Sequence, residues 1–284
     1  MELQTNTVAM NQKDFSRLSR FIHAEYGIMI PPVKKILLES RLQKRLRELK
    51  IKTFKDYCDY LFSPNGKSSE LTHFINQITT NKTDFFREPN HFEFLTQEAL
   101  PNLLKNDRSA SSNLTVWSAG CSSGEEPYTL AIVLSEYKSR NQNLKFNFSI
   151  LATDISHEVL LKAKQAVYKQ STVEPIPLML KKKYLLKSKD KNNGVVKIIP
   201  ELRQKVQLGK LNFMDKDYGI KKPVNVIFCR NVLIYFDRPT QETILTRLCR
   251  CLKKGGYFFQ GHSESINGMD LPLKSVSPTV YQKI

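Results

Sequence analysis

The sequence contains neither a C-x-x-C pair nor a cluster of cysteine with histidine, so its cysteines and histidines predict no metal site. The cysteines are odd in number and show no pattern, which fits a reducing compartment. They are Cys58, Cys121, Cys229, Cys249 and Cys251.

Long apolar runs and targeting signals are also missing. No run approaches the roughly 20 apolar residues that are needed to cross a bilayer. The start, Met1-Glu-Leu-Gln-Thr-Asn6, has neither the basic region nor the apolar core of a signal peptide. We therefore expect a cytoplasmic protein that does not insert into a membrane. The sequence also has no repeats and no low-complexity tract.

Acidic residues are scarce relative to basic ones. The 284 residues include 44 Lys and Arg against 27 Asp and Glu, which gives a net charge of +17. Such a charge favours polyanions or acidic protein surfaces as partners, although a generally cationic surface for solubility is the alternative. The apolar content of 40% is enough for one large domain or two smaller ones.

Apolar residues recur at helical spacing through the first quarter of the chain. Phe15, Leu18 and Ile22 lie on one face of a predicted helix, and Pro31-Pro32 separates it from a second helix. Lysine and arginine are frequent on the other faces. We expect residues 1–75 to form a basic helical domain, which either binds a partner through these charges or is merely solvated by them.

Residues 76–97 are a polar stretch around the pair Phe85-Phe86. Dense hydrogen-bonding groups beside buried aromatics are typical of a binding loop, and an interdomain linker is the alternative. Beyond it, residues 98–284 alternate between helical and strand patterns, which predicts a doubly wound, mostly parallel sheet. Strands are expected over 114–119, 146–153, 224–229 and 256–261, and helices over 126–137, 157–168 and 239–252.

A tight loop with two glycines follows the first of these strands. Val116-Trp-Ser-Ala-Gly-Cys-Ser-Ser-Gly-Glu-Glu-Pro-Tyr128 predicts a strand, a loop with Gly120 and Gly124, and a helix. The second strand ends on Asp154. A glycine turn lets the backbone approach a ligand closely, and an acidic residue at the end of the next strand can hold ribose hydroxyls. This pattern indicates a nucleotide-type cofactor at the carboxyl ends of the strands, where Cys229-Arg230-Asn231 is also expected.

The loop fits a dinucleotide poorly. It has the spacing G-x-x-x-G instead of G-x-G-x-x-G, and the helix opens with Glu125 and Glu126, which would oppose a pyrophosphate. S-adenosylmethionine fits better, because it has a ribose, no phosphate, and cationic groups that carboxylates attract. The alternative is that the two glutamates only complement the helix dipole.

An insertion interrupts the alternation at about 180–211. Tyr184-Leu-Leu-Lys-Ser188 and Val195-Val-Lys-Ile-Ile199 predict a hairpin around the polar turn 189–194, and residues 204–210 are a candidate third strand. The insertion is rich in lysine. An exposed edge of such a small antiparallel sheet could take a peptide by strand addition, and a solvated decoration is the alternative.

Several motifs together resemble the chemotaxis receptor methyltransferases of the CheR type, and the resemblance covers nearly the whole chain. The motifs are Asn81-x-Thr-x-Phe-Phe-Arg87, Ser118-Ala-Gly-Cys-Ser-Ser-Gly-Glu-Glu-Pro-Tyr128, Ala152-Thr-Asp154, Phe228-Cys-Arg-Asn-Val-Leu-Ile-Tyr-Phe-Asp237 and Gly255-Gly-Tyr-Phe-Phe-Gln-Gly-His-Ser-Glu264.

The resemblance implies a protein-glutamate O-methyltransferase with a Rossmann-like, S-adenosylmethionine-dependent domain, an N-terminal helical domain and an inserted antiparallel sheet. Its product from the cofactor is S-adenosylhomocysteine. The implied partners are the cytoplasmic helices of chemoreceptors and, through the inserted sheet, a receptor C-terminal tail. We expect a monomer. Residues expected at the cofactor, from the resemblance and the strand-end pattern, are Asn81, Thr83, Arg87, Gly120, Glu125, Asp154, Asn212, Phe213, Cys229, Arg230 and Asn231.

Two residues are candidates for the chemistry itself. Arg87 can hold a carboxylate in a fixed fork, unless it is merely paired with Glu88 or Glu93. Tyr235 follows the strand-end Cys229, where its hydroxyl could approach the transferred methyl group, and the alternative is an ordinary core aromatic.

Two other classes of function compete with this interpretation. A nucleic-acid methyltransferase would suit the charge, but the sequence lacks an aromatic-rich basic strip, and neither Cys121 nor Cys229 has an activating partner in the sequence. We therefore expect no nucleic-acid partner. A non-catalytic scaffold that binds the cofactor would keep Gly120 and Asp154 but would not need Arg87 or Tyr235.

Overall fold

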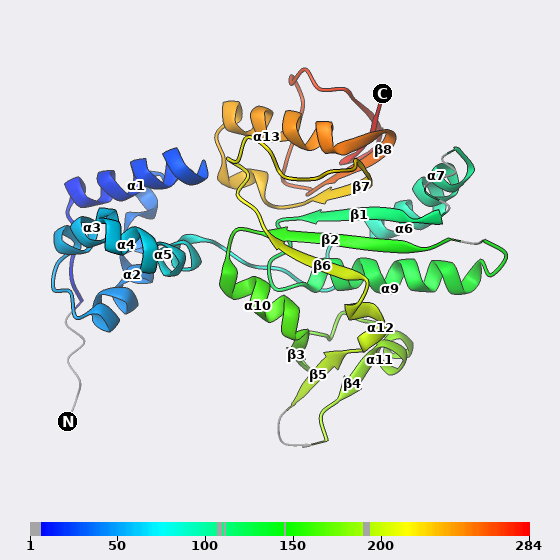
Figure 1. Ribbon diagram of the computed structural model, residues 1–284, viewed down its shortest axis with the longest axis horizontal. Coiled ribbons are helices and arrows are strands. Elements are labelled where there is room, and N and C mark those ends of the chain that lie inside the picture. The colour runs from blue at the N-terminus through cyan, green and yellow to red at the C-terminus, as the bar shows by residue number, and fades with distance from the viewer. Residues whose placement is uncertain (1–6, 107–109, 111, 145, 190–193) are drawn as a thin grey trace. The chain divides into compact units, whose positions relative to one another are not determined.

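The computed structural model describes residues 7–106, 110, 112–144, 146–189 and 194–284 (Figure 1). It divides into two compact units, Met1–Thr80 with Tyr235–Asp237, and Asn81–Ile234 with Arg238–Ile284. The division after residue 80 lies within the stretch 76–97 that the sequence sets apart. In the described part of the chain, no helix is both long enough and apolar enough to cross a membrane.

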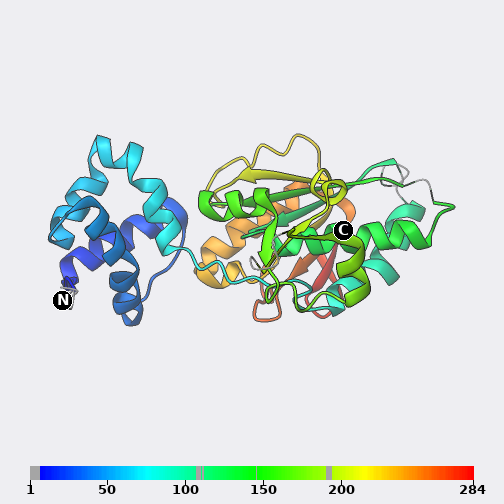
Figure 2. The same cartoon turned by 90° about the horizontal axis from the view of Figure 1, so that it is seen from below.

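The first unit is a bundle of helices, which Figure 2 shows gathered around one another. Asn11 caps the first helix by accepting a hydrogen bond from the Asp14 amide at 2.8 Å, and Gly27, with φ of 69°, ends it. Pro32 opens the 3-10 turn that precedes the second helix. The helices are α1 (Gln12–Tyr26), α2 (Lys35–Leu49), α3 (Phe54–Phe62), α4 (Pro64–Ser69) and α5 (Leu71–Ile78), with η1 (Pro32–Lys34).

One buried carboxylate ties this bundle together. Glu70 is 1% exposed, and it accepts hydrogen bonds from Arg45 Nε at 2.8 Å and from the Tyr57 hydroxyl at 2.9 Å. The bonds join α2 and α3 to the start of α5, so the polar groups of three elements satisfy one another inside an apolar core.

The second unit is built on a seven-stranded sheet with the order β6-β2-β1-β7-β8-β10-β9. Its first five strands are parallel, and the last two form an antiparallel hairpin at the edge. The mostly parallel, doubly wound sheet is thereby confirmed, and the sequence missed the hairpin. The strands are β1 (Leu114–Ala119), β2 (Phe148–Asp154), β6 (Val206–Lys210), β7 (Val224–Cys229), β8 (Leu252–Gln260), β9 (Leu273–Ser277) and β10 (Val280–Lys283).

Helices cover this sheet. Two of them pack against β2 and β6, and another packs against β8. The chain enters the unit through a polar stretch whose Phe85 packs edge-on against Tyr168 at 5.0 Å between ring centroids. Phe92 then stacks on Phe228 of β7, which holds this stretch against the sheet. The helices are α6 (Asn90–Phe94), the π-helical turn η2 (Leu95–Ala99), α7 (Leu100–Asn106), α9 (Glu125–Arg140), α10 (His157–Gln165) and α13 (Arg238–Cys251).

A separate three-stranded antiparallel sheet has the order β3-β5-β4, and Figure 1 draws it beyond β6. The predicted hairpin is confirmed as β4 (Leu185–Lys187) and β5 (Val195–Ile198), although its turn at 190–193 lies outside the described residues. Helices α11 (Leu178–Tyr184) and α12 (Pro200–Arg203) flank it.

The third strand of this small sheet is not the one that the sequence indicated. Residues 204–210 were expected there, but β6 pairs in parallel with β2 in the main sheet. The third strand is instead β3 (Val167–Lys169), which pairs with β5 and whose residues were partly assigned to a helix over 157–168. The helix stops because Ala166 adopts a left-handed conformation, with φ of 52°.

Candidate functional site

The loop between β1 and α9 is shaped by glycine. Gly124 has φ of 100°, and a Cβ there would lie 2.8 Å from the Tyr168 hydroxyl and 3.0 Å from Ala163 Cβ. Gly120 has φ of 86°, and a Cβ there would lie 2.5 Å from a methyl group of Val232. Neither position accepts a side chain without rearrangement, so the backbone itself forms the surface of the loop.

Asp154 closes this loop. It ends β2, and its two carboxylate oxygens accept hydrogen bonds from the amides of Ser122 at 2.8 Å and Ser156 at 2.9 Å. Burial raises the pKa of Asp154, and the two amide donors oppose that shift. Each oxygen keeps a second lone pair, so the carboxylate can still accept hydroxyl protons from a ligand.

The start of α9 carries two carboxylates in different surroundings. Glu125 is 4% exposed and accepts a hydrogen bond from the Ser123 hydroxyl at 2.7 Å. Glu126 accepts from the Ser118 hydroxyl at 2.7 Å and lies 3.4 Å from the guanidinium of Arg230. Burial raises the pKa of both groups, and Arg230 opposes the shift at Glu126.

Arg230 stands between two carboxylates directly after β7. Its side chain is 2% exposed, and it lies 3.2 Å from Glu88 as well as 3.4 Å from Glu126. Burial acts to raise the pKa of Glu88, but the Arg230 charge, the His262 amide and the Asn231 side chain outweigh it, so the pKa is lowered. The buried guanidinium is therefore neutralised by paired acids from two other elements.

Asn231 is held beside this pair by a left-handed backbone, with φ of 58°. Its amide side chain donates to Glu88 at 3.3 Å, and its backbone amide donates to Glu264 at 3.0 Å. Glu264 also accepts from the amides of Val232 at 2.8 Å and Gly261 at 2.7 Å. The loops after β7 and β8 are thus fixed to one buried carboxylate.

The entry stretch brings its predicted residues to the same loops. The carbonyl of Asn81 accepts a hydrogen bond from the Ser122 hydroxyl at 2.9 Å. Thr83, two residues further along the chain, is half-buried. Arg87 makes a hydrogen bond to the carbonyl of Lys82 at 3.3 Å. No ion pair from Arg87 to a glutamate is formed among the described residues, and its neighbour in sequence, Glu88, pairs with Arg230 instead.

Asn212 and Phe213 follow β6, the strand that pairs in parallel with β2. The Asn212 side chain accepts from the Met214 amide at 3.0 Å, and Phe213 is 9% exposed and packs edge-on against Tyr218. They therefore lie at the carboxyl end of the strand that neighbours β2.

Cys121 and Cys229 are buried in this region. They are 1% and 0% exposed, and burial raises the pKa of each thiol well above its ordinary value. Both thiols are therefore protonated at neutral pH, which makes them poor nucleophiles.

Tyr235 belongs to the other unit. It ends the short helix η4 (Leu233–Tyr235), and its carbonyl accepts from the Met29 amide at 2.8 Å. It is half-buried. The structure therefore groups it with the helical bundle.

Three acidic residues of the region were not among the predicted site residues, namely Glu88, Glu126 and Glu264. Glu126 and Glu264 lie inside motifs that the sequence singled out, and Glu88 directly follows the motif that ends at Arg87. Glu88 and Glu264 organise Arg230 and Asn231. Their partners are 142 and 33 residues away, and only the fold brings them together. The dense polar residues in and next to these motifs were the only sign in the sequence that these glutamates could belong to the site.

Comparisons with known proteins identify a family for each of the two parts of the chain. Residues 81–282 match the family model of the CheR methyltransferase SAM binding domain, and residues 13–79 match that of the CheR methyltransferase all-alpha domain.

Curated relatives match over nearly the whole length. The chain is 39% identical over 277 residues to a chemotaxis protein methyltransferase of Borreliella burgdorferi, covering 97% of this chain and 96% of the relative. It is 38% identical over 271 residues to chemotaxis protein methyltransferase 2 of Pseudomonas aeruginosa, covering 95% and 92%. It is 35% identical over 277 residues to the Escherichia coli chemotaxis protein methyltransferase, covering 98% and 93%. The chain therefore belongs to the CheR methyltransferase family and is an S-adenosylmethionine-dependent methyltransferase.

Proposed function

We propose that the protein methylates glutamate side chains on the cytoplasmic helices of chemoreceptors, forming glutamate methyl esters and S-adenosylhomocysteine. The supporting observation is the similarity over almost the full length to relatives named chemotaxis protein methyltransferase. The buried thiols of the candidate site agree with a carboxylate substrate, which needs no general base to become a nucleophile.

The residues around the glycine loop fit the cofactor. The left-handed glycines Gly120 and Gly124 give the loop its tight turn, and Asp154 retains lone pairs for ribose hydroxyls. Glu125 supplies a carboxylate near the cationic end. We propose that Asn81, Thr83, Arg87, Asn212, Phe213, Cys229, Arg230 and Asn231 complete the contacts, with Asn212 and Phe213 at the adenine.

When bound, S-adenosylmethionine supplies a methyl group on a sulfonium. A free glutamate has a pKa of about 4.3, so the substrate carboxylate is already an anion at neutral pH and requires no general base. The buried thiols of Cys121 and Cys229 agree with a mechanism in which the enzyme provides no nucleophile.

The task of the chain is then orientation and partial desolvation. Arg87 is half-buried, and none of its described contacts is an ion pair, so its guanidinium is available to hold a carboxylate of substrate or cofactor. We propose Arg87 and Tyr235 as the catalytic residues. Strong stabilisation of the substrate anion would slow the reaction, because charge is annihilated in the transition state.

The partners follow from the same proposal. Acidic receptor helices complement the net charge of +17. The lysine-rich inserted sheet is the proposed contact for a receptor C-terminal tail. We propose that the enzyme acts as a monomer in the cytoplasm and does not act on nucleic acid.

The test is transfer of labelled methyl from S-adenosylmethionine to receptor-containing membranes, followed by alkaline release of the label as methanol. We expect base-labile label on a receptor-sized band. Label that resists base, or label on nucleic acid, would contradict carboxyl methylation.

Substitution of Arg87 tests its part in methyl transfer. Arg87→Ala is expected to lower methyl transfer at least about a hundredfold, because orientation of a reacting group typically contributes that much. The matched control is Arg140→Ala, which removes an exposed arginine at the end of α9. Undiminished transfer by Arg87→Ala would remove Arg87 from the mechanism, and absence of transfer by the wild-type protein would support a scaffold.

A further inference from the structure

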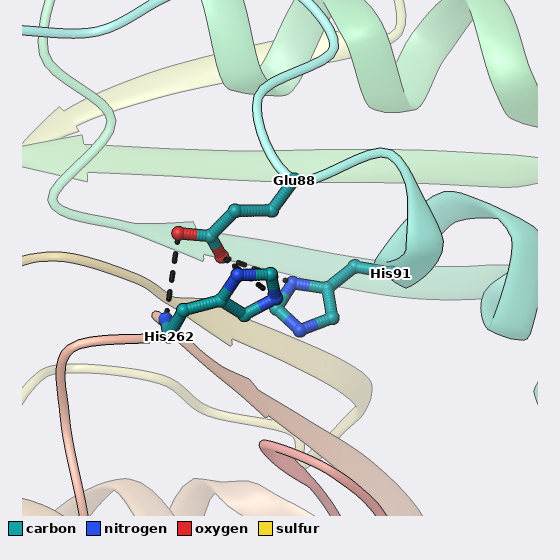
Figure 3. A group of neighbouring side chains, drawn as sticks. All are labelled: Glu88, His91 and His262. Atoms are coloured by element: carbon teal, nitrogen blue, oxygen red, sulfur yellow. Dashed lines mark hydrogen bonds and ion pairs between the residues drawn. The ribbon is translucent and has the colours of Figure 1, made fainter.

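Three potential metal ligands from distant parts of the sequence converge at one place (Figure 3). Glu88 precedes α6, His91 lies within it, and His262 follows β8. Each offers one ligand atom, and these atoms all lie within 4.8 Å of one another. Figure 3 shows both imidazole rings close to the Glu88 carboxylate.

The Nε2 atom of His91 already has a partner. It lies 2.7 Å from the Thr279 hydroxyl on the β9–β10 turn, so Nδ1 is the ring nitrogen that faces Glu88.

The Nδ1 atom of His91 is buried and makes no hydrogen bond. His91 is 2% exposed, and Nδ1 is one of the buried side-chain atoms of the described residues that lack such a bond. It lies 3.4 Å from Glu88 Oε2. A buried polar atom without a hydrogen bond calls for a partner, and a cation between Nδ1 and the carboxylate would supply one.

The Arg230 guanidinium also lies 3.2 Å from Glu88, so the cation would share this carboxylate with Arg230. An ionised carboxylate has acceptor positions on both of its oxygens, which allows it to contact both groups. His262 completes the group, with its Nε2 at 3.9 Å from Glu88 Oε2.

We infer that Glu88, His91 and His262 bind a divalent cation of the zinc class. Two imidazoles and one carboxylate are a ligand set of zinc and of neighbouring transition metals, and hard ions such as Mg²⁺ prefer oxygen-only sites. The side chain of His262 is 52% exposed, so an ion can enter from its side. The sequence predicted no metal site, because its ligands are not clustered along the chain.

The ion would connect the segment around the start of α6, which carries Glu88 and His91, to the loop after β8, which carries His262. This role is separate from methyl transfer, so the site can be tested without any activity assay.

The experiment is titration of the full-length, metal-free protein with Co²⁺, followed by visible absorption and by competition with Zn²⁺. We expect one equivalent to bind, with ligand-field bands of nitrogen and oxygen ligation and without a thiolate charge-transfer band, and Zn²⁺ to displace it. His262→Ala is expected to weaken binding at least about tenfold.

His157→Ala is the matched control, because it removes an exposed histidine at the start of α10 in the same unit. It should bind Co²⁺ as the wild-type protein does. Because His262 is exposed, its replacement leaves the core unchanged, and Glu88→Gln provides a second ligand variant. The inference is overturned if the wild-type protein takes up no stoichiometric Co²⁺, if thiolate bands appear, or if His262→Ala binds as tightly as the wild type.

Discussion

Gly124 is the single residue on which the shape of the cofactor loop most depends. Its φ of 100° is unfavourable for any other residue, and a Cβ would meet both the Tyr168 hydroxyl and Ala163. We predict that Gly124→Ala lowers the affinity for S-adenosylmethionine at least about tenfold, because strain of about 1–3 kcal/mol must be relieved by moving the loop. Isothermal titration calorimetry measures this change.

Gly219→Ala is the control for backbone strain alone. Gly219 has φ of 66°, and a Cβ there would meet nothing within 4 Å. We expect this variant to lose stability but to bind the cofactor normally. If both variants bound as the wild-type protein does, the close approach at Gly124 would have no part in binding.

The sequence identified single residues more readily than their contacts. Gly120, Asp154 and Arg230 were predicted at the strand ends and lie there, because buried parallel strands leave clear apolar runs. The bonds from Arg230 to Glu88 and to Glu126 could not be predicted, since they join segments that only the sheet order brings together. The residues that position a site are therefore harder to find than the strand ends that carry it.

Among the elements, long and uniformly buried strands were predicted best. The strands at Leu114–Ala119 and Val224–Cys229 were predicted with their observed bounds. The strand at Val206–Lys210 was assigned to the wrong sheet, because it lies at an edge and its side chains are only partly buried. The alternating polar and apolar residues of β6 resembled those of the preceding hairpin. Strand β3 has only three residues, which was too few to interrupt the predicted helix.

The inserted sheet is anchored to α9 by one carboxylate. Glu136 accepts hydrogen bonds from Lys183 at 2.6 Å and from the Tyr184 hydroxyl at 2.6 Å. Burial acts to raise the pKa of Glu136, but these two donors outweigh it, so the pKa is lowered. The contribution to stability is therefore complete above the unfolded-state pKa of about 4.3 and is lost as the pH falls through the folded-state value.

We predict that Glu136→Gln destabilises the protein at neutral pH by about 0.5–1 kcal/mol, a value that allows for solvent screening of Lys183. The difference from wild type should shrink below about pH 4. Urea unfolding at several pH values measures it. Glu158→Gln, which breaks the exposed pair with Lys162, is the control and should have a smaller effect. A difference that persisted unchanged at acid pH would contradict the ionic origin of the contact.

The lysines of the inserted sheet should contribute to receptor-tail binding. Lys187 is exposed on β4, and Lys182 is exposed on α11. We predict that reversing both charges to glutamate lowers the affinity for an acidic receptor-tail peptide about tenfold, because like charges would then face each other. Lys254→Glu with Lys222→Glu is the control, since it makes the same charge change at exposed positions elsewhere in that unit. Fluorescence anisotropy measures binding, and equal losses in both double variants would show that only net charge matters.

For the whole molecule, the sequence predicts a basic helical part over 1–75, a linker over 76–97 and an alternating part over 98–284. The structure divides after Thr80, which lies inside the predicted linker. The fold assigns residues 235–237 to the first unit, which no local pattern could indicate. This assignment includes Tyr235, so the sequence could name the residue but not the unit in which it lies.

The net charge of +17 leads to a prediction for receptor methylation. We expect long-range attraction to acidic receptor helices to raise the rate of encounter. Salt would screen this attraction, because the Debye length falls from about 10 Å at 0.1 M to about 3 Å at 1 M. We predict that kcat/KM for receptor methylation falls at least about tenfold over this range, through slower association. The affinity for S-adenosylmethionine, measured by calorimetry under the same conditions, should change much less, since the cofactor binds among short-range contacts. A methylation rate that did not respond to salt would mean that the positive surface serves solubility and does not steer the receptor.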